Sequence, residues 1–260
     1  MPSDKQLHGT YPRTRPALSK INIEHYETEY EKNRTGSGPI FALSAKFEEW
    51  MHKKIAQRRS RSPGLINQPA LELGAGGLNH VKFESDDFPY DALEPLDELC
   101  RQSEKFPRIN NLFDSFGSLA EIENKETYAR IFSTAVLEHL VDLPWVIAQS
   151  ARLLSRKGSI FQAAIPSEGG FAWGFSWRAT TGLRYRLKTG GSYSSLMRHE
   201  HVNSASEIEH IVRFFFTDVR IKRFPFPILH GSIYTYIEAT NPKKTIIDEF
   251  LANTPTIRAE

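Results

Sequence analysis

The 260-residue sequence predicts an α/β protein built on a mostly parallel sheet with helices on both faces. Three observations lead to this prediction. Short apolar runs alternate with helical patterns after Ser62-Pro63-Gly64, as in parallel βαβ units. The first run, Ala70–Leu73, turns directly into glycines. The last two runs lie too close together for a parallel crossover, so the sheet ends in an antiparallel hairpin.

Composition excludes several classes of protein. Thirty-three basic and 31 acidic residues give a net charge of +2, which indicates no nucleic-acid partner. Cys100 is the only cysteine, so an intrachain disulfide and a multi-cysteine zinc site are excluded. No apolar run approaches the roughly 18 residues that a membrane-spanning helix needs. We therefore expect a cytoplasmic protein without a membrane span.

The chain divides into three parts. Residues 1–20 are rich in proline and charge, which predicts a flexible or extended arm. Residues 21–62 form a helical extension, because apolar and aromatic residues recur at helical spacing over 22–32 and 41–59. Residues 63–260 then form the main domain, with an inserted cap at about 167–206.

The turn after the first strand reads Glu72-Leu73-Gly74-Ala75-Gly76 and suits an adenosine-containing cofactor. A side chain at either glycine would fill the space where such a ligand approaches the backbone. A dinucleotide fingerprint needs a third glycine where Asn79 stands, and a phosphate-binding P-loop needs a lysine that this turn lacks. What remains is acid-x-Gly-x-Gly, and an ordinary tight turn is the alternative.

The second strand, 90–94, ends on a carboxylate 22 residues after Glu72. A βαβ unit with a short helix gives this spacing, which places Glu94 where it can accept hydrogen bonds from both ribose hydroxyls. The alternative is that Glu94 caps the next helix, whose first turn would contain Pro95. A third strand is expected at 108–113, where Asp114 or Ser118 would contact an adenine amino group or simply form a turn.

The fourth strand, 128–133, leads through Thr134 into Val136-Leu137-Glu138-His139. A helix over 143–154, a turn at Lys157-Gly158 and a buried fifth strand over 159–165 follow. With the glycine turn and Glu94, this succession over about 65–166 resembles class I S-adenosylmethionine-dependent methyltransferases of the type 11 group. The resemblance implies a Rossmann-like, seven-stranded mixed sheet of order 3-2-1-4-5-7-6, in which the last strand is antiparallel.

The end of the chain tests this resemblance. Strands are expected at 217–224 and 232–239, and the short connection between them contains Pro225, Pro227 and Gly231. Such a connection requires an antiparallel hairpin. The hairpin agrees with the methyltransferase sheet and counts against a nicotinamide-dependent oxidoreductase.

The resemblance also implies S-adenosyl-L-methionine as the cofactor. Catalysis would consist mainly of aligning the acceptor with the methyl group and excluding water. By matching motif positions, the residues expected to line this cofactor are Glu72, Gly74, Ala75, Gly76, Glu94, Asp114, Ser133 and Thr134.

Substrate choice is expected to depend on the cap, whose aromatic side chains alternate with basic ones. Aromatic faces with cationic groups suit a small-molecule or glycan-like acceptor. The alternative is a hydrophobic cap that covers the sheet edge or forms a homodimer contact. The candidate substrate residues are Trp173, Trp177, Arg178, Arg184 and Tyr193.

His199 and His201 are the candidate general bases, because an imidazole near neutral pKa can accept the proton of an attacking hydroxyl. A metal is not expected, since one His-x-His without a third nearby ligand is more often structural. His139 is expected to orient the start of a helix or to pack near the cofactor. A catalytically inactive cofactor-binding protein and an NAD-dependent oxidoreductase are the competing interpretations.

Overall fold

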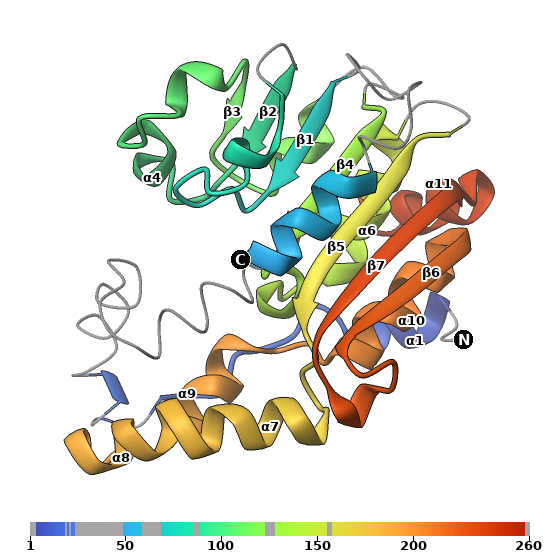
Figure 1. Ribbon diagram of the computed structural model, residues 1–260. Coiled ribbons are helices and arrows are strands. Elements are labelled where there is room, and N and C mark those ends of the chain that lie inside the picture. The colour runs from blue at the N-terminus through green and yellow to red at the C-terminus, as the bar shows by residue number, and fades with distance from the viewer. Residues whose placement is uncertain are drawn as a thin grey trace.

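The computed structural model describes residues 4–18, 20, 22–23, 49–58, 69–85, 89–122, 128–154 and 158–257. Its core is a seven-stranded sheet of order β3-β2-β1-β4-β5-β7-β6 (Figure 1). Strands β1 to β5 are parallel, and β7 is antiparallel to both of its neighbours, β5 and β6. The predicted order and the closing hairpin are confirmed. The strands are β1 (Ala70–Leu73), β2 (Tyr90–Leu93), β3 (Leu112–Phe113), β4 (Arg130–Thr134), β5 (Ile160–Pro166), β6 (Phe216–Pro225) and β7 (Ser232–Pro242).

The edge strand β3 is much shorter than the predicted 108–113. Phe106–Arg108 forms a 3-10 turn. The following turn is held by Asp91, whose Oδ1 accepts hydrogen bonds from the backbone N and the side-chain Nδ2 of Asn111, at 3.1 and 3.0 Å. The backbones of Asn110 and Asn111 still form hydrogen bonds with Tyr90 and Ala92 of β2, although the regular strand is limited to Leu112–Phe113.

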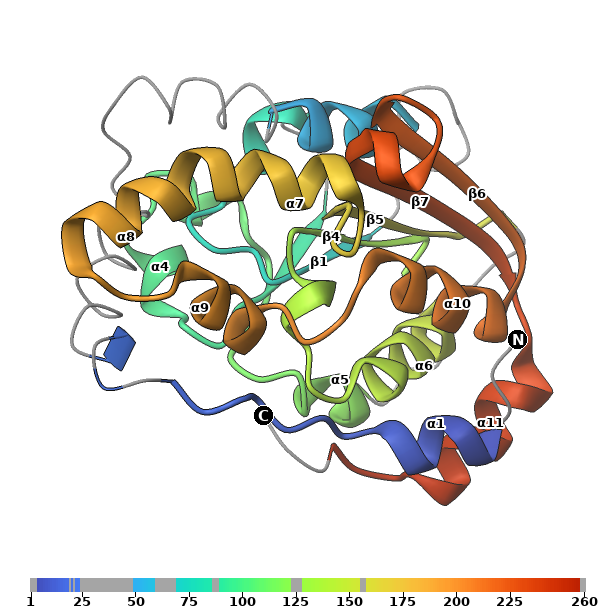
Figure 2. The same ribbon diagram turned by 90° about the horizontal axis from the view of Figure 1, so that it is seen from below.

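Helices surround the sheet, and α6 and α10 lie beside α11 on one face of it (Figures 1 and 2). The apolar side chains of these three helices form one core cluster with alternate residues of the strands, such as Leu71, Ile131 and Ile237. The helices are α1 (Asp4–Thr10), α4 (Glu98–Arg101), α5 (Ser118–Glu121), α6 (Leu143–Leu153), α7 (Phe171–Trp177), α8 (Leu183–Thr189), α9 (Tyr193–Glu200), α10 (Ala205–Phe215) and α11 (Lys244–Asn253).

The opposite face is covered by a helix over residues 49–58, which belongs to the predicted helical extension. Its Met51 and Ile55 are buried with Tyr90, Phe132 and Ala164 of the strands. Residues 21, 24–48 and 59–62 of that extension and the predicted linker at 62–64 lie outside the described residues.

The short helix predicted after the glycine turn is absent from the described part of that connection. Residues 76–80 form turns, and only Val81–Phe83 forms a 3-10 helix. His80 and Glu84 are buried rather than placed on a helix surface, and Glu84 Oε1 lies 2.6 Å from Arg130 Nη1. The ion pair between Glu84 and Arg130 thus fixes this connection against the sheet.

The N-terminal arm packs against the main domain over its described residues. It contains α1 and then an extended segment over 11–18 (Figure 2). Leu7 is buried in the core, and the His8 ring stacks on Phe250 of α11 at 4.8 Å. Tyr11 donates a hydrogen bond to Asn203, and Arg15 donates to the carbonyl oxygen of His139. Composition alone does not indicate these buried and polar contacts of the arm.

The segment predicted as a cap is largely helical. α7 continues through a π-helical turn, η5 (Arg178–Gly182), into α8, and α9 returns beside them. Figure 2 shows α7, α8 and α9 lying across the ends of β1, β4 and β5. In the described part of the chain, no helix combines the length and apolar character needed to cross a membrane.

Candidate functional site

A cavity of about 360 Å³ lies at the carboxyl ends of β1, β4 and β5, under α7. Ligands of open α/β sheets bind at this edge, where the strand order reverses. The residues that line the cavity, called the site pocket below, are Met51, His52, Glu72, Gly74, Ala75, Gly76, Asn79, Thr134, Ala135, Glu138, His139, Pro166, Trp173, His201 and Tyr234.

The two glycines of the turn are required for different reasons. Both have positive φ, +65° at Gly74 and +51° at Gly76. A Cβ on Gly74 would lie 2.4 Å from Cγ2 of Val136, so the first glycine is demanded by packing. A Cβ on Gly76 would meet nothing within 4 Å, which leaves open space where a ligand can approach the backbone.

Glu72 is a buried carboxyl group at the base of the site pocket. Tyr90 donates a hydrogen bond to its Oε2. Burial raises the pKa of Glu72 to about 8, although the Tyr90 hydrogen bond and the charge of Arg130 act in the opposite direction. The carboxyl is therefore largely protonated at neutral pH unless a cationic group lies next to it.

Glu94 holds the glycine turn in place. Its Oε2 accepts a hydrogen bond from the backbone N of Gly76 at 2.8 Å, and its Oε1 accepts one from Leu96 N at 3.0 Å. Leu96 precedes α4, whose N-cap is Asp97, so this contact holds a turn and is not the predicted helix cap. Glu94 is buried and does not line the site pocket, so its contact with a ribose stays a prediction.

At the end of β4, two hydroxyl groups are buried and lack a hydrogen-bond partner among the described residues: Ser133 Oγ and Thr134 Oγ1. Thr134 lines the site pocket and Ser133 does not. The next residue, Ala135, also lines the pocket and has φ +53°, a conformation that costs a non-glycine residue energy. Asp114, at the end of β3, is exposed and lies outside the pocket lining.

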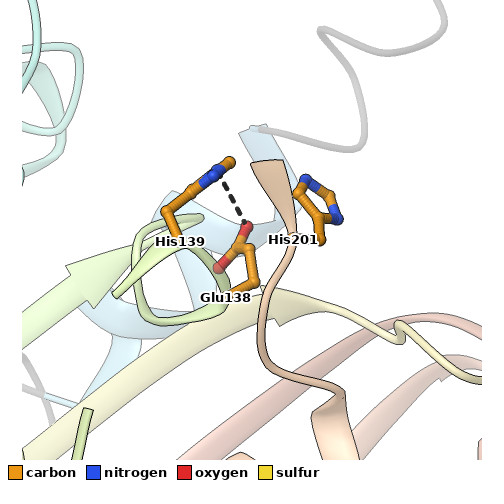
Figure 3. Close-up of side chains that lie close together, drawn as sticks. All are labelled: Glu138, His139 and His201. Atoms are coloured by element: carbon orange, nitrogen blue, oxygen red, sulfur yellow. Dashed lines mark ion pairs between the residues drawn. The ribbon is translucent and has the colours of Figure 1, made fainter. Parts of the chain in front are cut away.

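Opposite the glycine turn, Glu138, His139 and His201 lie close together (Figure 3). His139 Nε2 is 3.8 Å from Glu138 Oε1, and its Nδ1 is 3.0 Å from the carbonyl oxygen of Glu200. Burial lowers the pKa of His139, but the hydrogen bond to Glu200 and the charge of Glu138 outweigh it, so the pKa is raised.

His201 is held by Glu168, which lies just after β5. The distance from His201 Nδ1 to Glu168 Oε2 is 3.0 Å. Trp173 donates a hydrogen bond to the same carboxylate, and its ring stacks against His201 at 6.3 Å. Burial raises the pKa of Glu168, but the hydrogen bond from His201 and its charge lower it overall.

The sequence did not predict that Glu138 and His139 would join His201, about sixty residues further along. The two segments meet because the backbone N atoms of Val202 and Asn203 donate hydrogen bonds to the carbonyl oxygen of Glu138, at 2.8 and 3.1 Å. The only sequence signal was the Leu-Glu-His step itself. Of the two predicted bases, His201 lines the pocket, whereas His199 Nδ1 lies 2.8 Å from the carbonyl oxygen of Pro16, away from the pocket lining.

The five predicted substrate residues are distributed over two surfaces of the cap. Trp173 lines the site pocket. Trp177 packs against Tyr193, with ring centroids 5.7 Å apart, and the guanidinium of Arg178 lies 4.3 Å from the Trp177 ring. Arg184 borders a separate groove on the outside of α8. Only Trp173 is therefore in a position to contact a ligand in the site pocket.

No protein-family model and no curated protein sequence matches the chain. Solved structures do. A SAM-dependent methyltransferase from Archaeoglobus fulgidus is 12% identical, with a TM-score of 0.54 over 77% of this chain and 99% of that one. A possible histamine N-methyltransferase from Thermotoga maritima is also 12% identical, with a TM-score of 0.51 over 86% and 100%.

Phosphoethanolamine N-methyltransferase 2 of Haemonchus contortus, solved with S-adenosyl-L-methionine, is 14% identical with a TM-score of 0.50. The match covers 74% of this chain and 52% of that one, so the chain spans about half the length of this relative. Together with the sheet order, these similarities show that the chain has the fold of class I SAM-dependent methyltransferases.

Proposed function

We propose that this protein is a cytoplasmic S-adenosylmethionine-dependent methyltransferase, related to the type 11 group, that acts on a small-molecule or glycan-like acceptor. One observation carries the proposal. A single pocket joins the glycine turn after β1 and Thr134 after β4 to the titratable group Glu138, His139 and His201. A cofactor-binding region thus faces side chains that can bind and activate an acceptor.

The residues of the cofactor side fit a cationic, adenosine-containing ligand. The backbone at Gly76 is open, and the buried hydroxyl of Thr134 lacks a partner among the residues described. The Glu72 carboxyl would ionise next to an ammonium or sulfonium group, because a nearby positive charge lowers a carboxyl pKa. When bound, the cofactor supplies a methyl group that is already activated on sulfur. Ala75 also lines the pocket, whereas Glu94, Asp114 and Ser133 do not line it and are proposed to contact the cofactor by their motif positions alone.

The acceptor side consists of Trp173, His201 and their neighbours Glu138 and His139. The Trp173 ring offers a flat face for a sugar or a planar acceptor. Trp173 of α7 lines the pocket, and closure of the pocket over the bound ligands would exclude water from the reacting atoms. Activation of the acceptor is assigned to the three titratable residues, because His199 lies outside the pocket.

Calorimetric titration with S-adenosylhomocysteine and with NAD tests the proposed cofactor. We expect micromolar binding of S-adenosylhomocysteine and no binding of NAD. The reverse result would identify an oxidoreductase, and binding of neither ligand would contradict the proposal.

Incubation with methyl-labelled cofactor and a cell extract tests the proposed reaction. We expect label in a small-molecule or glycan fraction. Binding of S-adenosylhomocysteine without transfer to any fraction would favour the interpretation as an inactive cofactor-binding protein.

A further inference from the structure

We propose that Glu138, His139 and His201 bind one divalent transition-metal cation at the acceptor side of the site pocket (Figure 3). One potential ligand atom from each residue lies within 4.8 Å of the other two. Ligand atoms that share one ion at about 2.1 Å lie roughly 3–4 Å apart, so side-chain shifts of about 1 Å close the site. His139 Nε2 and Glu138 Oε1 are already 3.8 Å apart.

The hydrogen bonds of both imidazoles leave the same nitrogen for a metal. The Nδ1 atoms of His139 and His201 each lie 3.0 Å from an oxygen acceptor, the Glu200 carbonyl in one case and the Glu168 carboxylate in the other. Each Nδ1 is therefore placed to donate its proton, and in the neutral imidazole each Nε2 carries the lone pair. Metal-binding histidines are oriented by this kind of hydrogen bond from their second nitrogen.

Glu138 supplies the negative charge. The residue is 1% exposed, and its Oε2 has no hydrogen-bond partner among the described residues. A buried carboxylate oxygen without a partner is costly, and a bound cation would offset that cost. Two imidazole nitrogens with one carboxylate oxygen form a donor set typical of Zn²⁺ and related divalent ions, with coordination positions left open for a substrate.

The role of the cation rests on the proposed methyl transfer. An acceptor hydroxyl bound at an open position would lose its proton to water more readily, because the cation lowers its pKa. An oxygen lone pair then forms the bond to the methyl carbon, and the electrons of the broken carbon–sulfur bond return to sulfur. The products are a methyl ether, a neutral thioether and one proton. His201 would thus act as a ligand rather than as a free general base.

Titration of the EDTA-treated full-length protein with Co²⁺ tests the site by visible absorption, without reference to activity. We expect saturation at one Co²⁺ per chain and competition by Zn²⁺. Glu138→Gln and His201→Ala are expected to weaken Co²⁺ binding at least tenfold, and Glu168→Gln about 10-fold to 100-fold. The matched control is His199→Ala, which changes a histidine two residues away that does not line the pocket. Unfolding midpoints measured by circular dichroism show which variants are folded, and the near-isosteric Glu138→Gln is the variant expected to fold normally.

The proposal is overturned if the wild-type protein shows no saturable Co²⁺ absorption, or if folded Glu138→Gln and Glu168→Gln bind Co²⁺ as tightly as the wild type. S-adenosylhomocysteine binding by the same preparation separates the two proposals. Cofactor binding without Co²⁺ binding contradicts only the metal site. Co²⁺ binding without cofactor binding contradicts only the methyltransferase.

The outer face of the cap supports an independent inference: we propose that α7 and α8 dock on an anionic phospholipid surface. Four large apolar side chains of these helices are exposed, Phe171, Phe175, Leu183 and Leu187, by 73, 64, 53 and 79%. The π-helical turn between the helices has more residues per turn than an α-helix. The pair Phe171 and Phe175 and the pair Leu183 and Leu187 therefore lie closer to the same side of the cap. The adjoining connection between β6 and β7 adds exposed Phe226 and Ile228.

The charge of the same segment identifies the partner. From Gly169 to His199 the sequence contains no acidic residue, whereas basic residues recur along it. A helix with an exposed apolar stripe and flanking arginines and lysines suits the interface of an anionic bilayer, as on the cytoplasmic leaflet. The basic residues are Arg178, Arg184, Arg186, Lys188 and Arg198.

Co-sedimentation with lipid vesicles tests this surface. We expect at least tenfold tighter binding to vesicles of phosphatidylcholine with phosphatidylglycerol than to phosphatidylcholine alone, and loss of binding in the double variant Phe175→Ser, Leu187→Ser. The control is Leu96→Ser, an exposed apolar residue outside the cap. Equal binding to both vesicles, or none, overturns the inference. So does a change from dimer to monomer in the double variant by sedimentation velocity, which would identify a contact between two copies of the chain.

Discussion

The two faces of the sheet are built from the same strands but have different chemistry. The face under α6, α10 and α11 is buried with apolar side chains, among them Leu71, Ile131 and Ile237. The other face, under residues 49–58, buries Arg130 and Glu84 as an ion pair next to His80. Neighbouring residues of one strand, such as Ile131 and Arg130, therefore contribute to different environments.

This difference shows which face serves the site. Glu72 belongs to the polar face and also lines the site pocket. Burial has the largest effect on the pKa of Glu72 and raises it. The charge of Glu84 raises this pKa further, whereas the charge of Arg130 lowers it. The apolar face contributes stability through burial, whereas the polar face supports a titratable group at the cofactor side.

The largest effect is expected from breaking the polar face. Arg130→Met would leave Glu84 as a buried carboxylate without its cation and Gln162 without its hydrogen-bond donor. Removing one partner of a buried ion pair costs about 3–5 kcal/mol, so we expect that loss in urea-induced unfolding at pH 7. Ile147→Val in α6 is the control on the apolar face, at about 0.5–1.5 kcal/mol. A loss below the control would contradict the distinction between the faces.

The next effect is the contribution of the polar face to the pH dependence of stability. Burial lowers the pKa of His80 from 6.5 to about 4. Between these two pH values the imidazole is protonated in the unfolded chain but not in the folded one, so stability is lost as pH falls from 6.5 to 4. Burial raises the pKa of Glu84, but Arg130 and His80 lower it overall to about 2, which extends the loss from pH 4.5 downward. Glu72 acts in the opposite sense, since its raised pKa of about 8 removes stability as pH rises from 4.5.

Unfolding free energies measured between pH 3 and 9 check these signs. In Glu72→Gln, the unfolding free energy should fall less as pH rises from 4.5 to 8. In His80→Asn, it should fall less as pH drops from 6.5 to 4. An unchanged pH profile in both variants would show that the polar face does not control the titration. Ile147→Val again serves as the control, because it should shift the whole curve without changing its shape.

A smaller effect is expected at the glycine turn, where the two faces meet. Gly74→Ala would force a Cβ against Val136 of the apolar cluster at positive φ, for a loss of about 1–3 kcal/mol. Gly76→Ala would meet open space and cost about 1–2 kcal/mol of backbone strain. We expect only Gly76→Ala to weaken S-adenosylhomocysteine binding out of proportion to its stability loss, as measured by calorimetry beside urea unfolding.

The smallest effect concerns α10 on the apolar face. Ser204 and Glu207 form a capping box at its first turn. Ser204→Ala should cost about 1 kcal/mol in urea unfolding, because one backbone N–H loses its acceptor. Thr245→Ala, at an exposed position of α11, should change stability by less than about 0.5 kcal/mol. Equal losses of stability in the two variants would show that the capping box does not stabilise α10.

Much of the sheet was predictable from local pattern. Ala70–Leu73 has the predicted bounds, since a short apolar run ending in glycine has few other solutions. The closing hairpin followed from the length of its connection. The connection after Gly76 was not predictable, because its course depends on Glu84 pairing with Arg130, 46 residues away in sequence.

Part of the candidate site was predictable on each side of the pocket, since Trp173 and His201 of the predicted substrate and base residues also line it. Glu72, the glycines and Thr134 stand next to strand ends, and strand order places them together. The acceptor side depends on α9 returning to the turn after β4, which brings His201 to Glu138. The packing of the N-terminal arm likewise depends on contacts with distant residues, such as that of Tyr11 with Asn203.

By itself, the sequence determined the succession of strands, the glycine turn with its carboxyl group and the antiparallel end of the sheet, because each depends on residues close together in the chain. Tertiary structure alone decided which histidine faces the pocket and which carboxylate joins it. It also decided which cap side chains face outward. Those outcomes depend on contacts between segments far apart in sequence, and no local pattern encodes such contacts.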